Sequence, residues 1–413
     1  MDNKADTREN PMLRYGKNCR LIAVTFFTIW ISLSETSVYA REDEVLLGMS
    51  TALSGPAEEL GQNMRLGVEI RLASENAKGG VKGRRIRLLA WDDGYEPEQT
   101  VPNMRDLIEI EHVLAVIGNV GTPTAISALP IASEEKTLLF APYTGAGVLR
   151  KIPPNRYVIN YRASYAEETS AMVDALINHA GLMPQEIAFF TQRDGYGDAG
   201  YVGGISALKK FGLKSETAII HTRYERNTLV VENALADILL ADPTPRAVIM
   251  VGAYAPSARF IKLARGAGLE ALFLNVSFVG AEPIARELGT EYDGVIVTQV
   301  VPHPEDTSLP IVDRYQQDLL LYGEGKRSSF GSLEGYLAAE IFIKALSRLD
   351  NAPNRENIID ALEGLGEFSI GTGHKLHFDK NDHQASHRVW PTVLRDGKFV
   401  PFQWADIPLL LKR

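Results

Sequence analysis

The residues best suited to binding chemistry are Gly121-Thr122-Pro123-Thr124, which follow an apolar run at residues 113–117. Thr122 is of a type that caps helices, and Pro123 suits the first helical position. Backbone N–H groups at a helix start lack partners inside the helix, so together with a hydroxyl they can hold a carboxylate or another anion. An ordinary capped helix would have the same residues. The position of these residues after an apolar run favours an anion site, because ligands of open α/β sheets bind at the carboxyl ends of strands.

Side chains that can ligate a metal gather near the end of the chain. They are His374, His377, His383, His387, Asp379 and Asp382. Their spacing is not that of ligands on one helix face, so a solvated hairpin and loop explains them better than a metal site. Asp92 and Asp93 could act as general acid and base, but an acidic strand end at the rim of a sheet is the commoner arrangement.

Signatures of common enzymes are absent from the sequence. It contains no G-x-S-x-G around a serine, no phosphate-binding G-x-x-x-x-G-K-[ST] and no G-x-G-x-x-G that opens a helix. The stretch Gly145-Ala146-Gly147-Val148-Leu149-Arg150 begins like the last motif but ends in arginine. Asp and Glu number 52 against 43 Lys and Arg, a net charge of -9, so nucleic acid is not expected as a partner. These features predict a protein that is not an enzyme and carries no cofactor.

The first forty residues have the layout of a secretory signal. Residues 21–33 carry no charge, Lys17 and Arg20 precede them, and Val38-Tyr39-Ala40 offers a small-x-small cleavage site. A membrane span needs about 20 apolar residues, so an anchor is less expected. We therefore predict that residues 1–40 are a signal peptide and that the mature protein is periplasmic. Translation could start at Met1 or at Met12, and Cys19, the one cysteine, would be removed with the peptide.

Short apolar runs alternate with amphipathic stretches along the rest of the chain. Strands are predicted at 45–49, 86–91, 113–117, 138–140, 186–190, 216–220, 247–251, 272–274 and 294–297. Helices are predicted at 60–76, 96–110, 122–135, 201–211, 229–240, 258–267, 310–321 and 332–349. A β-rich tail follows at 375–379, 389–395 and 399–402. Alternation of this kind predicts parallel sheets covered on both faces, and the number of strands predicts two doubly wound, Rossmann-like lobes.

The order of several short motifs resembles one family along nearly the whole mature chain. These motifs are Ser54-Gly55-Pro56, Leu60-Gly61, Gly79-Gly80-Val81-Lys82-Gly83, Asp92-Asp93, Val116-Ile117-Gly118, Tyr196-Gly197 and Asp396-Gly397. Over residues 43–402 the sequence resembles the type I periplasmic solute-binding proteins of ABC importers, in particular the leucine/isoleucine/valine-binding family. Each motif alone is weak, whereas their order and spacing are specific.

The resemblance implies two Rossmann-like lobes joined by three crossings, with a small ligand in the cleft between them. Lobe one would comprise residues 43–162 and 299–371, and lobe two residues 163–298 and 372–413. Closure about the hinge would deliver the ligand to a permease and ATPase complex, which would be the only contact with the membrane.

The resemblance also implies a set of ligand-binding residues. Thr122 would hold the ligand carboxylate. Tyr143 and Gly145 occupy the first and third positions of a loop that contacts the ligand in the family, although Tyr143 is larger than usual and Gly145 lacks the usual hydroxyl. Tyr196 and Tyr254 would close from lobe two, and Leu60 would form an apolar wall.

Ser277 departs from the family pattern, because the matching position in amino acid binders carries an acid that pairs with the ligand ammonium. An unpaired buried ammonium is costly. This departure implies a ligand other than an ordinary α-amino acid, namely a small carboxylate or amide with an apolar or aromatic body. Arg162 and Arg193, expected at the cleft rims, could meet a second acid group, although plain surface charges are the commoner case.

Two other functions are compatible with the sequence. A ligand receptor for a sensor kinase would use the same fold without transport. A periplasmic metal-dependent enzyme would use the histidines of the tail.

Overall fold

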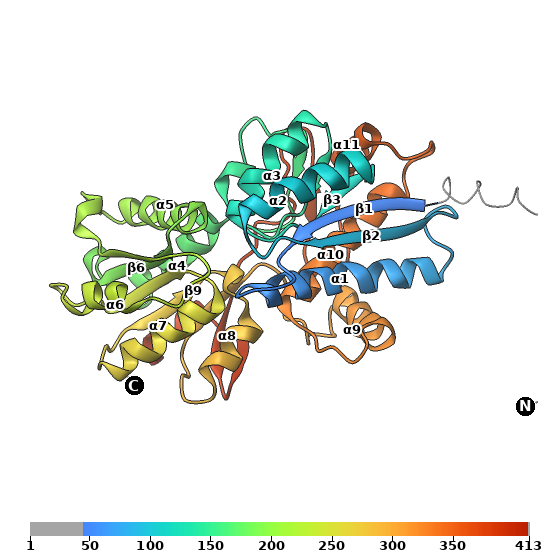
Figure 1. Ribbon diagram of the computed structural model, residues 1–413. Coiled ribbons are helices and arrows are strands. Elements are labelled where there is room, and N and C mark those ends of the chain that lie inside the picture. Colours follow the sequence, from blue (N-terminus) through green and yellow to red (C-terminus); the bar gives the residue numbers. More distant parts are fainter. Residues whose placement is uncertain (1–43, 412–413) are drawn as a thin grey trace, which may run out of the picture. The chain divides into compact units, whose positions relative to one another are not determined.

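The computed structural model describes residues 44–411, and from Val45 onward they belong to one compact unit. The predicted signal peptide, residues 1–40, lies outside the described residues. Among the helices of the described part, none is long and apolar enough to cross a membrane. The fold contains two large sheets, and the expected α/β architecture is confirmed (Figure 1).

The first sheet has five strands in the order β2-β1-β3-β4-β5. The strands are β1 (Glu44–Thr51), β2 (Arg85–Asp92), β3 (Ala115–Ile117), β4 (Leu138–Phe140) and β5 (Val158–Ile159). From β1 to β5 neighbouring strands run parallel, and β1 and β3 are adjacent although β2 lies between them in the sequence. Their side chains, among them Leu47, Val116 and Phe140, are buried on both faces of the sheet, as a parallel sheet requires.

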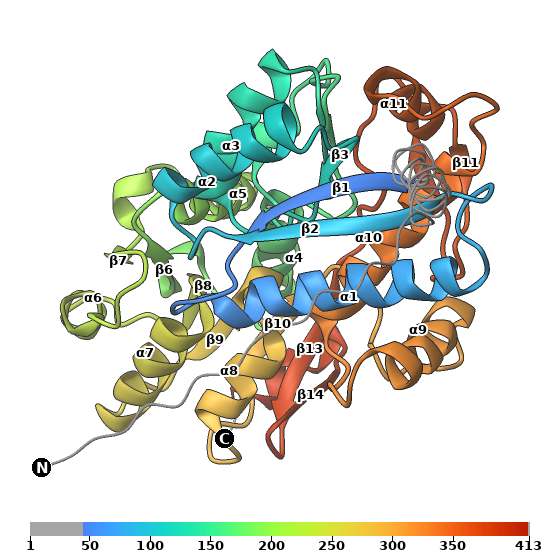
Figure 2. The same ribbon diagram turned by 45° about the vertical axis from the view of Figure 1, so that its right-hand side comes forward.

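The second sheet has seven strands in the order β14-β13-β10-β9-β8-β6-β7. The strands are β6 (Ile187–Gln192), β7 (His221–Tyr224), β8 (Ala247–Val251), β9 (Leu272–Asn275), β10 (Ile296–Gln299), β13 (Trp390–Arg395) and β14 (Lys398–Pro401). The strands from β7 to β10 are parallel, whereas β13 and β14 form the predicted hairpin and join β10 antiparallel (Figure 2). A small third sheet pairs β11 (Gly366–Phe368) with β12 (Leu376–Phe378).

Helices flank both sheets. They are α1 (Glu58–Ala77), α2 (Pro97–Arg105), α3 (Thr122–Glu134), α4 (Tyr165–Asn178), α5 (Gly195–Lys210), α6 (Glu232–Leu239), α7 (Tyr254–Gly266), α8 (Ala281–Leu288), α9 (Pro310–Tyr322), α10 (Phe330–Leu346) and α11 (Arg355–Glu363). Below, "first lobe" denotes the first sheet with α1, α2, α3 and α9 to α11, and "second lobe" denotes the second sheet with α4 to α8.

Two glycines allow α1 and α10 to pack closely. A Cβ on Gly67 would lie 1.8 Å from the carbonyl oxygen of Ser332, and one on Gly335 would lie 2.2 Å from that of Met64. Neither position leaves room for a methyl group, so glycine at both positions allows α10 to lie directly against α1 (Figure 2). This contact ties residues after 330 to the first lobe.

One predicted strand is wrong, and several elements were not predicted. Residues 216–220 contain a 3-10 turn, Glu216–Ala218, because the Ser215 hydroxyl accepts from the Thr217 N–H, and the strand starts only at His221. The predicted helix 96–110 ends as α2 at Arg105 and continues as a π-helical turn, Asp106–Ile110. The helices α4, α8 and α11 were not predicted.

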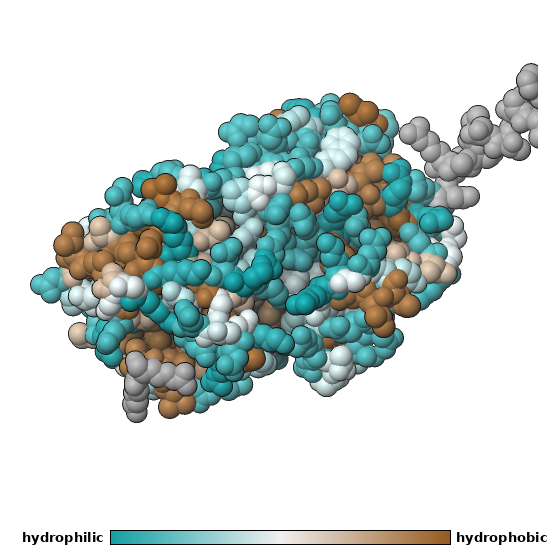
Figure 3. All heavy atoms as spheres, turned by 60° about the horizontal axis from the view of Figure 1, so that its bottom comes forward, coloured by the Kyte–Doolittle hydropathy of each residue, from teal (hydrophilic) through white to brown (hydrophobic). Residues whose placement is uncertain are grey.

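The lobe boundaries at 162, 298 and 371 stay a prediction. In the last of these regions, Gln384 forms a parallel bridge with Asn160 just after β5, and the chain enters β13 at Trp390. On the face drawn in Figure 3, apolar side chains form small separate patches within a largely hydrophilic surface.

Candidate functional site

In each large sheet the order in which strands are added reverses at one point, and predicted binding residues follow the strands there. In the first sheet this switch point lies between β1 and β3, and the residues that follow β3 lead to Thr122. In the second sheet it lies between β6 and β8, which are followed by Tyr196 and Tyr254. Crevices at such switch points are where open α/β sheets bind ligands.

Thr122 is the first helical residue of α3 and not its cap, contrary to the prediction. The cap position is taken by Gly121, whose φ of 107° only glycine adopts easily. The Thr122 hydroxyl instead lies 2.6 Å from the Thr144 hydroxyl, and both side chains are fully buried. On its other side Thr122 approaches the start of α5, because a Cβ on Gly195 would lie 3.7 Å from Thr122 Cγ2.

An aromatic cluster joins the two lobes, with Phe278 at its centre. The Phe278 ring lies 4.6 Å from the Tyr196 ring in the second lobe, centroid to centroid. It lies 5.6 Å from the Tyr143 ring and 5.9 Å from the Tyr95 ring, both in the first lobe. All four side chains are buried, and rings at such distances attract one another beyond simple area burial. Phe278 thus holds Tyr143 and Tyr196, two predicted site residues, in one place.

Tyr165, the first residue of α4, extends this cluster. Its ring lies 5.3 Å from the Tyr196 ring, and its hydroxyl is buried without a hydrogen-bond partner among the described residues. Gly145 packs directly on Tyr165, since a Cβ there would lie 2.6 Å from the Tyr165 nitrogen. This contact explains why Gly145 has no side chain. The Tyr196 hydroxyl donates to the Gly252 carbonyl at 3.2 Å.

An acid lies beside Ser277, although none was expected at the matched pocket positions. Glu168, one turn after Tyr165, accepts from the Ser277 N–H at 2.7 Å, the Ser277 hydroxyl at 3.0 Å and the Thr298 hydroxyl at 2.5 Å. Burial raises the pKa of Glu168, while the charge of Arg162 and these hydrogen bonds oppose the rise. The expectation that no acid accompanies Ser277 is therefore wrong, because Glu168 reaches it from α4, outside the matched pocket positions.

Arg162 is a buried residue and not a rim charge. Its Nε and Nη2 donate to the two Glu334 carboxylate oxygens, each at 2.9 Å, and both side chains are almost fully buried. Its guanidinium carbon lies 4.3 Å from the centroid of the Tyr143 ring. Arg193, by contrast, is exposed and pairs with Glu225 at 2.7 Å.

Leu60 and Tyr254 lie at a second contact between the lobes. A Cβ on Gly280, which precedes α8, would lie 2.7 Å from Leu60 Cδ2. Burial, together with the charges of Glu59 and Glu58 at the start of α1, raises the pKa of Tyr254 to about 12. Both side chains are buried, so the two residues pack at the junction of α1 with α7 and α8. No ring contact joins Tyr254 to the Phe278 cluster within the part of the chain described.

Polar contacts also connect the lobes around this region. Glu96 accepts from Arg226 Nη2 and from Asn227 Nδ2, each at 2.6 Å. The Phe330 N–H at the start of α10 donates to Glu282 of α8 at 2.8 Å. Arg286 and Glu59 form a further ion pair across the same junction. The two lobes are therefore closed on each other in this structure.

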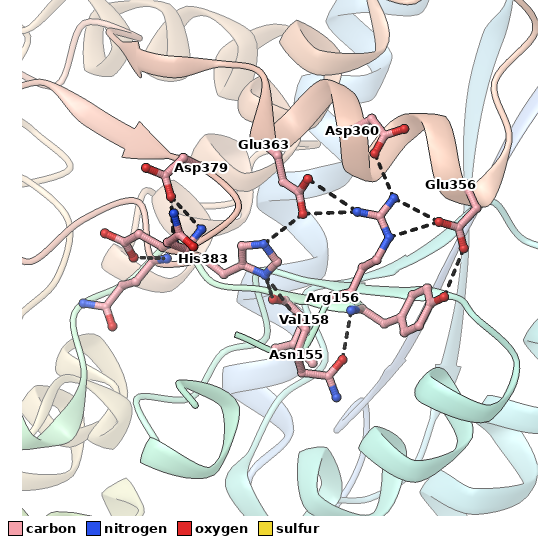
Figure 4. A network of polar contacts seen from close by, with 12 residues as sticks. Asn155, Arg156, Val158, Glu356, Asp360, Glu363, Asp379 and His383 are labelled. Atoms are coloured by element: carbon pink, nitrogen blue, oxygen red, sulfur yellow. Dashed lines mark hydrogen bonds and ion pairs between the residues drawn. The ribbon is translucent and has the colours of Figure 1, made fainter. Parts of the chain in front are cut away.

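The histidines of the tail face different partners. His383 is buried, and its ring nitrogens lie 2.8 Å from the Val158 carbonyl and 3.2 Å from Glu363 (Figure 4). His377 pairs with Asp379 at 3.0 Å, and His387 pairs with Glu167 at 2.6 Å. Within residues 44–411 no three such side chains are grouped around a point that could hold a metal ion.

Asp92 and Asp93 organise the loops at the ends of β1 and β2. Asp92 accepts from the Leu53 and Gly94 N–H groups at 2.8 and 2.9 Å. Asp93 accepts from the Ser50 hydroxyl at 2.7 Å and the Tyr95 N–H at 3.0 Å. Burial raises the pKa of Asp93 to about 6. Because these bonds fix the loop that carries Tyr95, the acid pair has a positioning role.

The main residues that sequence reasoning missed are Phe278, Tyr95, Tyr165 and Glu334. Tyr165 begins α4, and the start of this helix carries a signal that could have been read. Ser164 and Glu167 form a capping box in which the Ser164 hydroxyl accepts from the Glu167 N–H at 3.2 Å. Phe278 offers no comparable signal, because a lone phenylalanine in a short turn looks like any core residue.

The chain is similar to known proteins over nearly its whole described length. A family model described as periplasmic binding protein matches residues 44–398. The Leu/Ile/Val-binding protein homolog 7 of Brucella abortus is 26% identical over 384 residues, covering 86% of this chain and 90% of that protein.

Solved structures agree with this similarity. The crystal structure of a possible leucine/isoleucine/valine-binding protein from Rhodopirellula baltica matches with a TM-score of 0.86 and 47% identity, covering 89% of this chain and 98% of that one. A solute-binding protein of an ABC transporter from R. palustris shares the fold at a TM-score of 0.75 and 19% identity, covering 87% of this chain and 95% of that one. The chain therefore belongs to the periplasmic binding protein family, in its Leu/Ile/Val-binding group, and is a solute-binding protein and not an enzyme.

Proposed function

We propose that this protein captures a small organic solute between its two lobes and delivers it to an ABC importer. The proposal rests on the way predicted site residues gather around Phe278. The rings of Tyr143 and Tyr196 contact Phe278, and Ser277 precedes it in the chain. Thr122 contacts Thr144, and Gly145 contacts Tyr165, whose ring extends the cluster. The solute would be a carboxylate, an amide or an amino-acid-like compound with an apolar body. Aromatic walls with a few polar groups are typical of such sites.

The named relatives support this class of ligand. The proteins from Brucella abortus and Rhodopirellula baltica both carry names that refer to leucine, isoleucine and valine. The Glu168 carboxylate beside Ser277 removes the reason for excluding amino acids, because an acid is available close to the site. Leucine, isoleucine and valine therefore belong among the candidate ligands.

The experiment that tests this function is a thermal-shift screen followed by calorimetry. Leucine, branched and aromatic carboxylates, and their amides would be added to the purified mature protein. A ligand that binds only the folded state raises the unfolding temperature by mass action. At a ligand concentration of one hundred times its dissociation constant, the free energy of unfolding rises by about 2.7 kcal/mol. Failure of every member of these classes to bind would contradict the proposal.

Delivery to an importer and export from the cell are separate parts of the proposal. We infer a periplasmic location from the predicted signal peptide, which N-terminal sequencing of exported protein tests by finding a mature end near Arg41. Uptake of the labelled ligand should fall when the gene is deleted. Unchanged uptake, with a kinase response that depends on the protein, would favour the sensor alternative.

A further inference from the structure

We propose that Nη1 of Arg162 and the hydroxyl of Tyr165 together bind an anionic oxygen of the solute, so that the ligand is an organic acid whose negative charge is required. This inference rests on the proposed function and narrows the ligand class. It differs from the sequence-based expectation, in which Thr122 holds the carboxylate and Arg162 stands at the rim.

The first observation is the orientation of Arg162. Glu334 engages Nε and Nη2, which fixes the plane of the guanidinium, and Tyr143 covers one face of it at 4.3 Å. Nη1 is buried and has no hydrogen-bond partner among the described residues. A buried guanidinium nitrogen without an acceptor is costly. An oxygen of a bound solute would supply the acceptor.

The second observation is the hydroxyl of Tyr165, which makes no hydrogen bond of ordinary geometry, although Thr144 and the Gly145 N–H lie close enough to lower its pKa. It too is fully buried, on a side chain that contacts Gly145 and the Tyr196 ring. The positive charge of Arg162 lowers the pKa of Tyr165 against the larger effect of burial, so the two groups lie within electrostatic reach of each other. A buried guanidinium nitrogen without an acceptor and a buried hydroxyl in the same aromatic cluster match the needs of a carboxylate, which accepts several hydrogen bonds.

The third observation is a second buried guanidinium, that of Arg150, which contacts the backbone of Arg162. Arg150 donates to the carbonyl oxygens of Thr144 and Arg162 at 3.2 and 3.0 Å, and to the side-chain oxygen of Gln384 at 2.7 Å. All its acceptors are neutral. Burial and the charge of Arg162 together lower the pKa of Arg150 to about 10, although the charge of Glu167 opposes part of this effect. An anion beside Arg162 would therefore stabilise both cations.

The nearby acids do not supply an acceptor for Nη1 of Arg162 or for the Tyr165 hydroxyl. The Glu334 carboxylate is bound to Nε and Nη2 of Arg162 and leaves Nη1 free. The Glu168 carboxylate is held by Ser277 and Thr298 of the second lobe. Because neither acid bonds to Nη1 or to the Tyr165 hydroxyl, both donors remain available for a solute.

The test compares acids with their neutral amides in three matched pairs. The probes are 4-methylpentanoate and 4-methylpentanamide, benzoate and benzamide, and leucine and leucinamide, titrated by calorimetry against the full mature protein. We expect at least one acid to bind, and to bind at least about a hundredfold more tightly than its amide, since a charged acceptor is strongly preferred by a buried guanidinium.

Tyr165→Phe removes one donor without changing the shape of the site. We expect it to weaken binding of the preferred acid by about tenfold and that of the amide by much less, with the unfolding temperature kept or raised. Tyr161→Phe is the comparison variant, because its hydroxyl is equally buried, unpartnered and within reach of the Arg162 charge, whereas no ring contact joins Tyr161 to the Phe278 cluster among the described residues. An equal loss in both variants would overturn the assignment of Tyr165.

Arg162 needs a double variant, because removing it alone would leave Glu334 charged and buried. Arg162→Gln combined with Glu334→Gln removes both charges together. We expect the preference for the acid over its amide to fall below about threefold in a folded protein, as judged by circular dichroism. An unchanged preference would overturn the proposal. So would tight binding of an amide or an amine with no acid bound, and that outcome would leave solute binding itself intact. If none of the six compounds binds, the proposed function fails together with the inference.

Discussion

Ser277 donates two hydrogen bonds to Glu168, one from its backbone N–H at 2.7 Å and one from its hydroxyl at 3.0 Å. The serine thus holds a fully buried acid of α4 against the turn that carries Phe278. The acid and the serine come from segments more than a hundred residues apart, and together they link α4 to the end of β9.

Ser277→Ala should therefore lower the stability of the fold more directly than it lowers ligand affinity. The backbone bond remains, but one hydrogen bond to a buried carboxylate is lost. We expect the free energy of unfolding to fall by about 1.5 to 3 kcal/mol, measured by urea denaturation. Glu168→Gln combined with Ser277→Ala should cost less than the sum of the single changes, because both remove the same interaction. Strict additivity would contradict this account of the pair.

Thr122→Ala should weaken ligand binding without uncapping α3. Gly121 holds the cap position and no side chain caps this helix, so the loss is confined to the hydroxyl pair with Thr144. We expect a fall of about 1 kcal/mol in stability and about tenfold in affinity. Thr122→Ser, which keeps the hydroxyl, is the control and should retain most of the affinity. Wild-type affinity in a folded Thr122→Ala would remove this residue from the site.

Phe278→Ala should destabilise the closed, ligand-free protein and also impair binding. Truncating a buried phenylalanine costs about 3 to 5 kcal/mol, and here the lost contacts come from both lobes. Phe260→Ala is a matched control, because Phe260 is buried within the second lobe and stacks on Phe190 at 4.2 Å. Both variants should lower the unfolding temperature, whereas only Phe278→Ala should change ligand affinity. Equal effects on affinity would contradict a role for Phe278 between the lobes.

Glu282 predicts a pH dependence of stability near neutrality. Burial, with a smaller contribution from the charges of Glu305 and Glu59, raises the pKa of Glu282 to about 7. The hydrogen bond from the Phe330 N–H opposes part of this rise. The folded state therefore binds a proton that the unfolded state releases above its ordinary pKa of about 4.3. The stabilisation is full below that value and is lost as the pH rises toward 7.

Glu282→Gln should remove this contribution while keeping an acceptor for Phe330. We expect the difference in stability between variant and wild type to move in favour of the variant between pH 5 and pH 8, measured by urea denaturation across that range. Asp93, whose pKa is also raised by burial, contributes in the same direction to both proteins and cancels in the difference. A difference that does not change with pH would contradict the role of Glu282.

Much of the fold could be predicted because its signals are local. The strands β4 and β8 lie exactly where buried apolar runs predicted them, at 138–140 and 247–251, and the hairpin turn at Asp396-Gly397 followed from its residue types. The site was harder to predict than the fold, because its geometry depends on which distant segments of the chain come into contact. Arg162 reads as a surface charge until α10 brings Glu334 to it. Thr122 reads as a cap until the φ of Gly121 is known.

The central claim is that one small organic solute contacts both lobes at the Phe278 cluster. A crystal structure of the protein with its tightest ligand from the acid and amide series tests it most directly. We predict that the solute lies within van der Waals contact of Tyr143 and Tyr196, with its anionic group at Nη1 of Arg162 and the Tyr165 hydroxyl. A solute bound to one lobe alone, or away from these four residues, would contradict the account.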